Sequence, residues 1–173
     1  MKTDRPSPTE IATAIKHLPK RLIGRTKDSE WSKHLKEYIG SLGEKHGWDI
    51  CASGCKGRFD NGWLYDLIWY HEDPDTHLAE VYLVLESEWR TPQSDIKYDF
   101  EKLLLAKATL KVMVFQGNDR NISGLFNFLE RGISAFQKRS ADETYILAAF
   151  NNSTYAFDVR QFNGNGEPCG STI

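Results

Sequence analysis

The segment EVYLVLESEW, residues 80–89, constrains the fold of this chain more than any other feature. Alternate residues of a strand point to opposite faces of a sheet. Here both sets are apolar until Glu86 and Glu88, and the alternation places Tyr82 and Val84 on the same face as these two glutamates. A strand with two apolar faces belongs in the middle of a sheet that is covered on both sides. The segment therefore predicts an α/β fold with a central mixed β-sheet flanked by helices.

Helical and strand patterns alternate along the rest of the chain. An amphipathic helix is predicted over 29–46, and Thr91 and Pro92 are predicted to cap and open a second helix. A third helix is expected to begin at Asn121 and to be broken or ended by Gly132. The predicted strands are 48–52, a hairpin of 63–70 and 80–89 around the turn 71–77, a parallel strand at 111–116, and a closing hairpin of 144–150 and 154–162.

The length of 173 residues predicts one domain over 1–173, with a basic N-terminal segment at 1–28 and a loose tail at 163–173. Apolar residues make up 40% of the chain, but no apolar run approaches the roughly 20 residues of a membrane span. The first residues also lack the apolar centre of a signal peptide, so a cytoplasmic location and no membrane contact are expected. Cys51 and Cys55 in CASGC favour reduced thiols, with half of a zinc site as the alternative.

Positive charge is concentrated at the start of the chain. Residues 1–27 contain seven Lys or Arg and two acids, which gives +5, although the whole chain has a formal charge of −2. Lys20, Arg21, Arg25 and Lys27 are candidates for contacts with a nucleic-acid backbone. The alternative is a solvated basic face without a ligand.

Three acids interrupt apolar strand patterns and need an explanation, since an isolated buried carboxylate is costly. Asp66 lies in the predicted strand 63–70, and Glu86 and Glu88 lie in its hairpin partner. If the two strands pair antiparallel, with positions equidistant from about residue 74 facing each other, Asp66 lies opposite the region from Tyr82 to Val84. Some asymmetry in the turn would bring it within reach of Glu86. Carboxylates that are forced together favour a hard divalent cation, Mg²⁺ or Mn²⁺. The alternative is that backbone donors satisfy Asp66 and that the glutamates lie at an exposed strand end.

The segments LYDLIWY, VYLVLESEW, DFEKLL and KVMVF, in this order, resemble the PD-(D/E)xK superfamily, which has the restriction-endonuclease-like fold. The resemblance implies that Asp66 and Glu86 bind the metal and that Glu88 stands where the family usually has a lysine. This arrangement is similar to the E-x-E form of some type II restriction enzymes. Lys102 is the candidate for a lysine moved to the following helix, and a surface ion pair between Lys102 and Asp99 is the alternative.

The resemblance also implies an activity. We expect a Mg²⁺-dependent endonuclease that hydrolyses phosphodiester bonds, of DNA more than of RNA, with Asp66, Glu86, Glu88 and Lys102 at its catalytic site. Glu44 in the first helix is a possible additional acid, or a residue of a solvated face. A chain this short has little room for elements that read a base sequence. A homodimer or a larger protein partner is therefore expected to supply specificity. The alternatives are a noncatalytic nuclease-fold module that binds nucleic acid or protein, and a zinc-binding regulatory protein.

Overall fold

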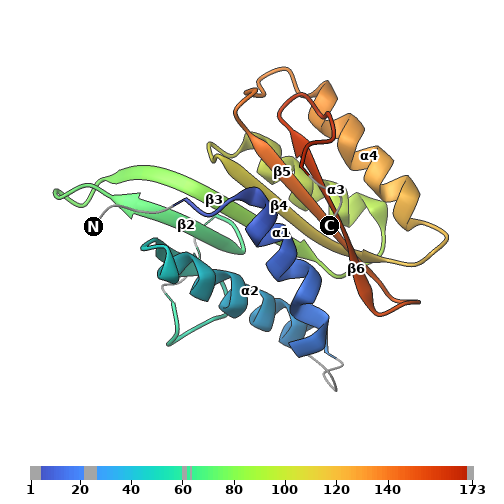
Figure 1. Ribbon diagram of the computed structural model, residues 1–173, viewed down its shortest axis with the longest axis horizontal. Helices are drawn as coiled ribbons and strands as arrows, with labels where there is room; N and C mark the ends of the chain where they lie inside the picture. Colours follow the sequence, from blue (N-terminus) through green and yellow to red (C-terminus); the bar gives the residue numbers. More distant parts are fainter. Residues whose placement is uncertain (1–4, 22–26, 60–61, 63, 171–173) are drawn as a thin grey trace.

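The computed structural model describes residues 5–21, 27–59, 62 and 64–170, and Figure 1 shows how their helices and strands are arranged. The helices are α1 (Pro8–His17), the short 3-10 helix η1 (Leu18–Arg21), α2 (Asp28–Lys45), α3 (Gln93–Leu105) and α4 (Ile122–Ala135). The strands are β1 (Asp49–Ala52), β2 (Leu67–Glu72), β3 (Leu78–Glu88), β4 (Leu110–Gly117), β5 (Thr144–Asn151) and β6 (Ala156–Asn163). None of the described helices has the length and apolar character that crossing a membrane requires.

The described strands form one mixed sheet in which spatial order equals sequence order, β1-β2-β3-β4-β5-β6. Neighbouring strands are antiparallel from β1 to β3 and again between β5 and β6. The pairs β3–β4 and β4–β5 are parallel, because α3 and α4 carry the chain back along the sheet between these strands. The predicted hairpins, the parallel crossover and the mixed sheet are confirmed.

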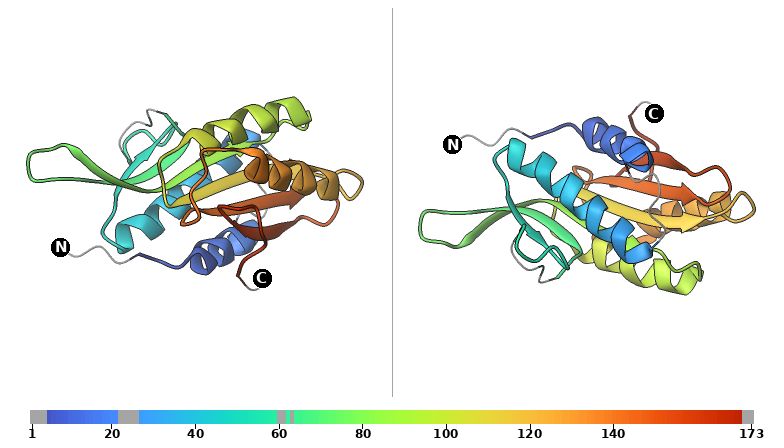
Figure 2. Two further views of the ribbon diagram at one scale, coloured as in Figure 1. Left: turned by 90° about the horizontal axis from the view of Figure 1, so that it is seen from above. Right: turned by 90° about the horizontal axis from the view of Figure 1, so that it is seen from below.

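Helices cover both faces of the sheet (Figure 2). The core on one face joins α1 and α2 to side chains such as Leu85, and the core on the other face joins α3 and α4 to side chains such as Val84. Gly43 brings α2 close to the sheet, since a Cβ there would lie 2.6 Å from the ring of Trp69. The central position predicted for β3 is therefore confirmed. The β2–β3 hairpin extends beyond the body of the protein (Figures 1 and 2).

Irregular pairing changes the register of the β2–β3 hairpin. The register shifts between Trp69 and Tyr70 and again between His71 and Glu72, and Leu67 ends up opposite Leu85. The predicted position of Asp66 opposite Tyr82 to Val84 is therefore wrong, because each irregularity moves one strand along the other. The shift also places Tyr82 in the core on the α1–α2 face, whereas the simple alternation predicted it on the face of the glutamates.

The ends of three elements also differ from prediction. Asp66 lies in the bend before β2, because the strand begins only at Leu67. Pro92 is the N-cap residue of α3, with no side-chain cap, so the predicted capping role of Thr91 is wrong. Gly132 lies inside α4, which continues to Ala135, and its missing side chain leaves space for the Phe100 ring, 3.0 Å from where a Cβ would stand.

Two parts of the chain are more ordered than the sequence indicated. The basic N-terminal segment contains α1, whose Ile11, Ala12 and Ile15 are buried. After β6, the chain turns back along that strand, and the Cys169 amide donates to the carbonyl oxygen of Gln161 at 2.9 Å.

Candidate functional site

Asp66 is held by serines from the two neighbouring strands. Its Oδ2 accepts hydrogen bonds from the amide of Ser87 at 3.0 Å and from the Ser87 hydroxyl at 2.7 Å, and its Oδ1 accepts one from the Ser53 hydroxyl at 3.1 Å. Ser53 follows β1, and Ser87 lies between the two glutamates of β3. These three hydrogen bonds fix the orientation of the Asp66 carboxylate.

Helix α2 supplies a lysine to the same carboxylate. The Lys36 ammonium donates to the Ser53 hydroxyl at 3.0 Å and lies 3.9 Å from Oδ1 of Asp66. Lys36 is only 6% exposed, so its charge acts in a medium that screens it weakly. Asp66 therefore has a partner of opposite charge within the protein.

Glu86 lies on the opposite face of the sheet, toward α3. It is 3% exposed, and its Oε1 lies 2.6 Å from the Lys102 ammonium. Lys102 is therefore the cationic partner of this buried carboxylate. Burial raises the pKa of Glu86 to about 8, against the opposing effect of Lys102, and the charge of Asp66 raises it further.

Lys102 binds a second carboxylate from its own helix. Its ammonium lies 3.3 Å from Oδ1 of Asp99, so the predicted alternative of a Lys102–Asp99 pair exists together with the pair to Glu86. Burial lowers the pKa of Lys102, but the two carboxylates outweigh burial and raise it. Burial also raises the pKa of Asp99, and the charges of Glu88 and Asp66 add to that effect.

Glu88 has partners of its own at the end of β3. Its Oε1 accepts from the Arg90 amide at 2.7 Å, and the Arg90 guanidinium lies 3.4 Å from Oε2. The same guanidinium lies 3.3 Å from Asp95 at the start of α3. Glu88 is therefore tied to the loop between β3 and α3.

The acids at this end of the sheet have the chemistry that a hard cation needs. Asp66 Oδ1 accepts one hydrogen bond, from Ser53, and Glu86 Oε1 has the Lys102 ammonium as its partner. Carboxylate oxygens of this kind fit Mg²⁺ or Mn²⁺. Asp66, Glu86 and Glu88 do not, however, form a group of three ligand atoms within 4.8 Å of one another.

The remaining predicted residues lie elsewhere or outside the described part of the chain. The side chains of Lys20 and Arg21, and the whole of Arg25, fall outside it, whereas Lys27 is exposed at the N-cap of α2. Glu44 pairs with Arg58 through two contacts of 2.9 and 2.5 Å near the other end of α2.

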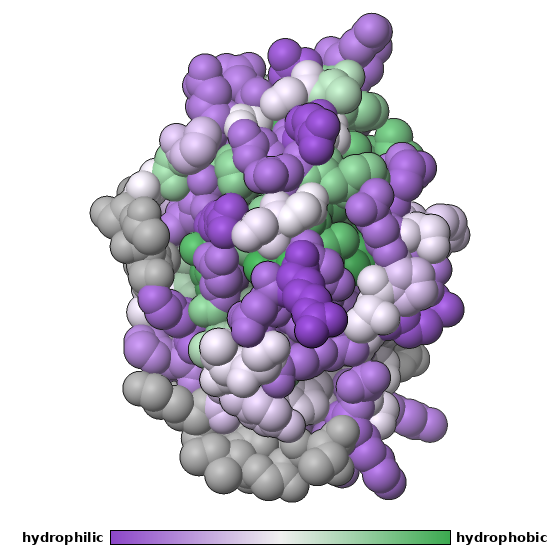
Figure 3. Space-filling model, turned by 90° about the vertical axis from the view of Figure 1, so that its right-hand side faces the viewer, coloured by the Kyte–Doolittle hydropathy of each residue, from purple (hydrophilic) through white to green (hydrophobic). Residues whose placement is uncertain are grey.

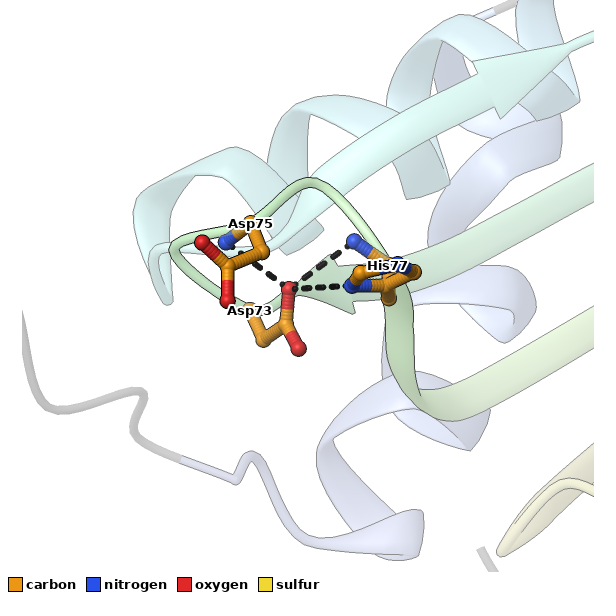
Figure 4. Close-up of side chains that lie close together, drawn as sticks. All are labelled: Asp73, Asp75 and His77. Atoms are coloured by element: carbon orange, nitrogen blue, oxygen red, sulfur yellow. Dashed lines mark hydrogen bonds and ion pairs between the residues drawn. The ribbon is translucent and has the colours of Figure 1, made fainter.

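A separate acidic group lies at the tip of the β2–β3 hairpin (Figure 4). Asp73, Asp75 and His77 are exposed, and one ligand atom from each lies within 4.8 Å of the other two. Oδ1 of Asp73 accepts from the amides of Asp75 and His77 at 3.0 and 2.9 Å. These bonds close the turn, which explains the group without a metal.

Sequence reasoning missed three residues that bind Asp66, namely Lys36, Ser53 and Ser87. Ser87 had a signal, because it alternates with two glutamates on a strand that is otherwise apolar. Lys36 had only a weak signal, because the apolar stripe that predicted the buried face of α2 contains its neighbour Leu35 and no lysine. In comparisons with known proteins, no protein-family model and no curated protein matches this chain.

Proposed function

We propose that this protein is a metal-dependent nuclease of the PD-(D/E)xK type that hydrolyses phosphodiester bonds, of DNA more than of RNA. One observation carries the proposal: the buried carboxylate of Glu86 lies 2.6 Å from Lys102 of the following helix and near enough to Asp66 that the charge of Asp66 raises its pKa. Two acids and a lysine from three elements are the set that the sequence resemblance requires. The order of elements from α2 to β4, one helix, three strands, a helix and a parallel strand, also agrees with it.

The residues divide into metal ligands and groups that act on the water and the phosphate. Asp66 Oδ1 and the Glu86 carboxylate would hold Mg²⁺. When bound, the cation would supply Lewis-acid activation of water and neutralise charge on the scissile phosphate. Lys102, the nearest ammonium to Glu86, would then donate a hydrogen bond to the attacking water or to a phosphate oxygen. Glu88, fixed by the Arg90 amide, would accept a hydrogen bond from that water.

A second function has an observation of its own in favour. Each of the two acids already has a lysine, Lys36 for Asp66 and Lys102 for Glu86, so their charges are balanced without a metal. Oδ2 of Asp66 also accepts two hydrogen bonds from Ser87. This arrangement suits a noncatalytic module that keeps the acids as structural groups and binds nucleic acid or protein by other surfaces.

Cleavage assays and metal titrations separate the two functions. The purified protein is incubated with single-stranded, duplex and branched DNA and with RNA, in Mg²⁺, Mn²⁺ or EDTA. The variants are Glu86→Gln, Lys102→Met and Glu101→Gln. Glu101 is the matched control, because it lies beside Lys102 on α3 but is half exposed and pairs with Lys97.

The nuclease proposal predicts metal-dependent cleavage by the wild type and by Glu101→Gln, with a loss of at least about 100-fold in the other two variants. Cleavage that survives Glu86→Gln would show that the metal site is elsewhere. Binding of DNA by a folded protein that neither cleaves it nor takes up Mn²⁺ would establish the noncatalytic module.

A further inference from the structure

A small aromatic hollow lies at the carboxyl ends of β3, β4 and β5. Its volume is about 130 Å³, and the residues that line it come from the start of α2, the ends of these strands and the β5–β6 turn: Asp28, Trp31, Trp89, Gln116, Phe150, Asn152 and Tyr155. Figure 3 shows the right-hand end of Figure 1, where the β5–β6 turn lies; apolar residues show in the middle of this face, with hydrophilic ones around them. The hollow is much smaller than the roughly 300–1,000 Å³ of a pocket that encloses a whole small molecule. It has room for one planar ring.

Four of the seven lining residues are aromatic, and among these four only Tyr155 is exposed. Trp31 lies with its ring centroid 4.7 Å from that of Phe150 and 5.8 Å from that of Trp89, and both tryptophans are 7% exposed. Tyr155 stands edge-on to Phe150 at 5.5 Å and is 66% exposed, so much of its ring faces solvent. Its backbone has a φ of 57°, which non-glycine residues rarely adopt, and the bond from its amide to the carbonyl oxygen of Asn151 at 2.8 Å holds it there.

Polar groups at the rim can recognise the edge of a planar heterocycle. Asn152 is exposed at the rim, so its side-chain amide can donate a hydrogen bond to a bound ring or accept one from it. The exposed carboxylate of Asp28 can accept from an exocyclic amino group. Gln116 uses its amide nitrogen to donate to the carbonyl oxygen of Trp89, which leaves its oxygen as an acceptor. Aromatic faces combined with amide and carboxylate groups are the means by which proteins bind unstacked nucleobases.

Hydrogen bonds connect the hollow to the candidate catalytic site. The indole of Trp89 donates to the Ser32 hydroxyl at 2.8 Å, which lies 3.2 Å from the Ser87 hydroxyl, and this in turn donates to Asp66 at 2.7 Å. Lys27, a predicted phosphate-binding residue, directly precedes Asp28 in the chain and is exposed. A predicted phosphate-binding residue therefore adjoins, in sequence, a residue that lines the hollow.

We propose that the aromatic hollow binds one unpaired base of a nucleic-acid strand, with the base stacked on Tyr155 and its edge hydrogen-bonded by Asn152. The inference rests on the proposed function as far as nucleic acid is the ligand, and it names the substrate class: single-stranded DNA, or DNA with an unpaired base next to the cleavage site.

The test compares two oligonucleotides of equal length and charge, (dT)₈ and its abasic counterpart, which keeps the sugar-phosphate chain but lacks bases. Their binding is measured by fluorescence anisotropy for the wild type, Tyr155→Ala, Tyr155→Phe, Asn152→Ala and Tyr98→Ala. Tyr98 is the matched control, since it is 70% exposed on α3 and does not line the hollow. Tyr155→Phe keeps the ring, and both Tyr155 variants keep a Cβ at the same backbone position.

The expected result is that the wild type binds (dT)₈ more tightly than the abasic strand, and that Tyr155→Ala weakens (dT)₈ binding by about 5- to 150-fold without affecting the abasic strand. Tyr155→Phe and Tyr98→Ala should bind as the wild type does, and Asn152→Ala should be weaker. Equal binding of the two strands, or a Tyr155→Ala variant as tight as the wild type, would overturn the inference and leave the proposed function intact. Binding of neither strand, with no cleavage of any nucleic acid, would overturn both.

Discussion

Replacing Glu86 by glutamine is expected to stabilise the protein at neutral pH. Burial raises the pKa of Glu86 to about 8 from an ordinary value of 4.5, so the folded protein holds a proton that the unfolded chain has already lost. Each pKa unit corresponds to about 1.4 kcal/mol. Relative to a pH below 4.5, the raised pKa of Glu86 lowers the free energy of unfolding by roughly 3 kcal/mol at pH 7. Near pH 8 the loss is between about 4 and 5 kcal/mol. Glutamine has the same shape and carries no charge, so it avoids this cost.

The sign of the effect follows from proton binding. Between pH 4.5 and 8 the folded state binds more protons at this position than the unfolded state, so stability decreases as pH rises through this range. At pH 5 Glu86 is protonated in the folded protein, and the advantage of Glu86→Gln should shrink to about 1 kcal/mol or less. The raised pKa of Lys102 adds no slope here, since that group titrates far above pH 8 in both states.

Urea unfolding at pH 5, 6, 7 and 8, followed by tryptophan fluorescence, measures the prediction. The difference in unfolding free energy between Glu86→Gln and the wild type should increase with each step in pH. The half-exposed control Glu101→Gln should have the same unfolding free energy as the wild type at every pH. Parallel pH profiles of the wild type and Glu86→Gln would refute the reasoning, because they would show that Glu86 is already ionised throughout this range.

Three further substitutions test other parts of the structure. Asp66→Asn should lower the unfolding free energy by about 1–3 kcal/mol, because an amide cannot accept all three serine hydrogen bonds; a neutral effect in urea unfolding would contradict the described network. Lys111→Met should cost about 3 kcal/mol, since it leaves Glu143, 2.8 Å from the buried ammonium, without its cation, and an unchanged thermal midpoint would argue against that pair. Arg58→Ala should leave the midpoint and any metal affinity unchanged, because its pair with Glu44 is exposed; a loss of metal binding would return Glu44 to the site.

The fold was predictable where side-chain periodicity decides it. Both faces of 80–89 are apolar until the glutamates, and β3 is a central strand. The crossover through α3 makes β4 parallel to β3, as predicted, whereas the parallel pairing of β4 with β5 was not predicted. The helix α1 was not predicted, because residues 1–28 were interpreted by their positive charge alone. Ser7 and Pro8 nevertheless form an ordinary helix start, and Ile11 and Ile15 lie one turn apart on its buried face.

The site was predictable only in part, because it depends on details that periodicity does not contain. Lys102 lies 2.6 Å from Glu86, and the catalytic role that the resemblance implies for it stays a prediction. The register that brings Asp66 to Ser87 depends on two irregularities in the hairpin, which follow from three-dimensional packing and not from the pattern of apolar residues. Lys36 reaches Asp66 from a helix that only the folded protein places there.

The packing of α1 has a consequence for the order in which the protein acquires its structure. Each strand pairs with its neighbour in sequence, so the sheet can grow from β1 to β6 as the chain is made. Helix α1 precedes all of these strands, yet it packs on β5 and β6 at the far end. Its apolar face with Ile11 and Ile15 therefore stays without its final partner until the last hairpin has formed. The docking of this first helix therefore waits for the last part of the sheet, and a chain that stops before β6 leaves the buried face of α1 without its partner.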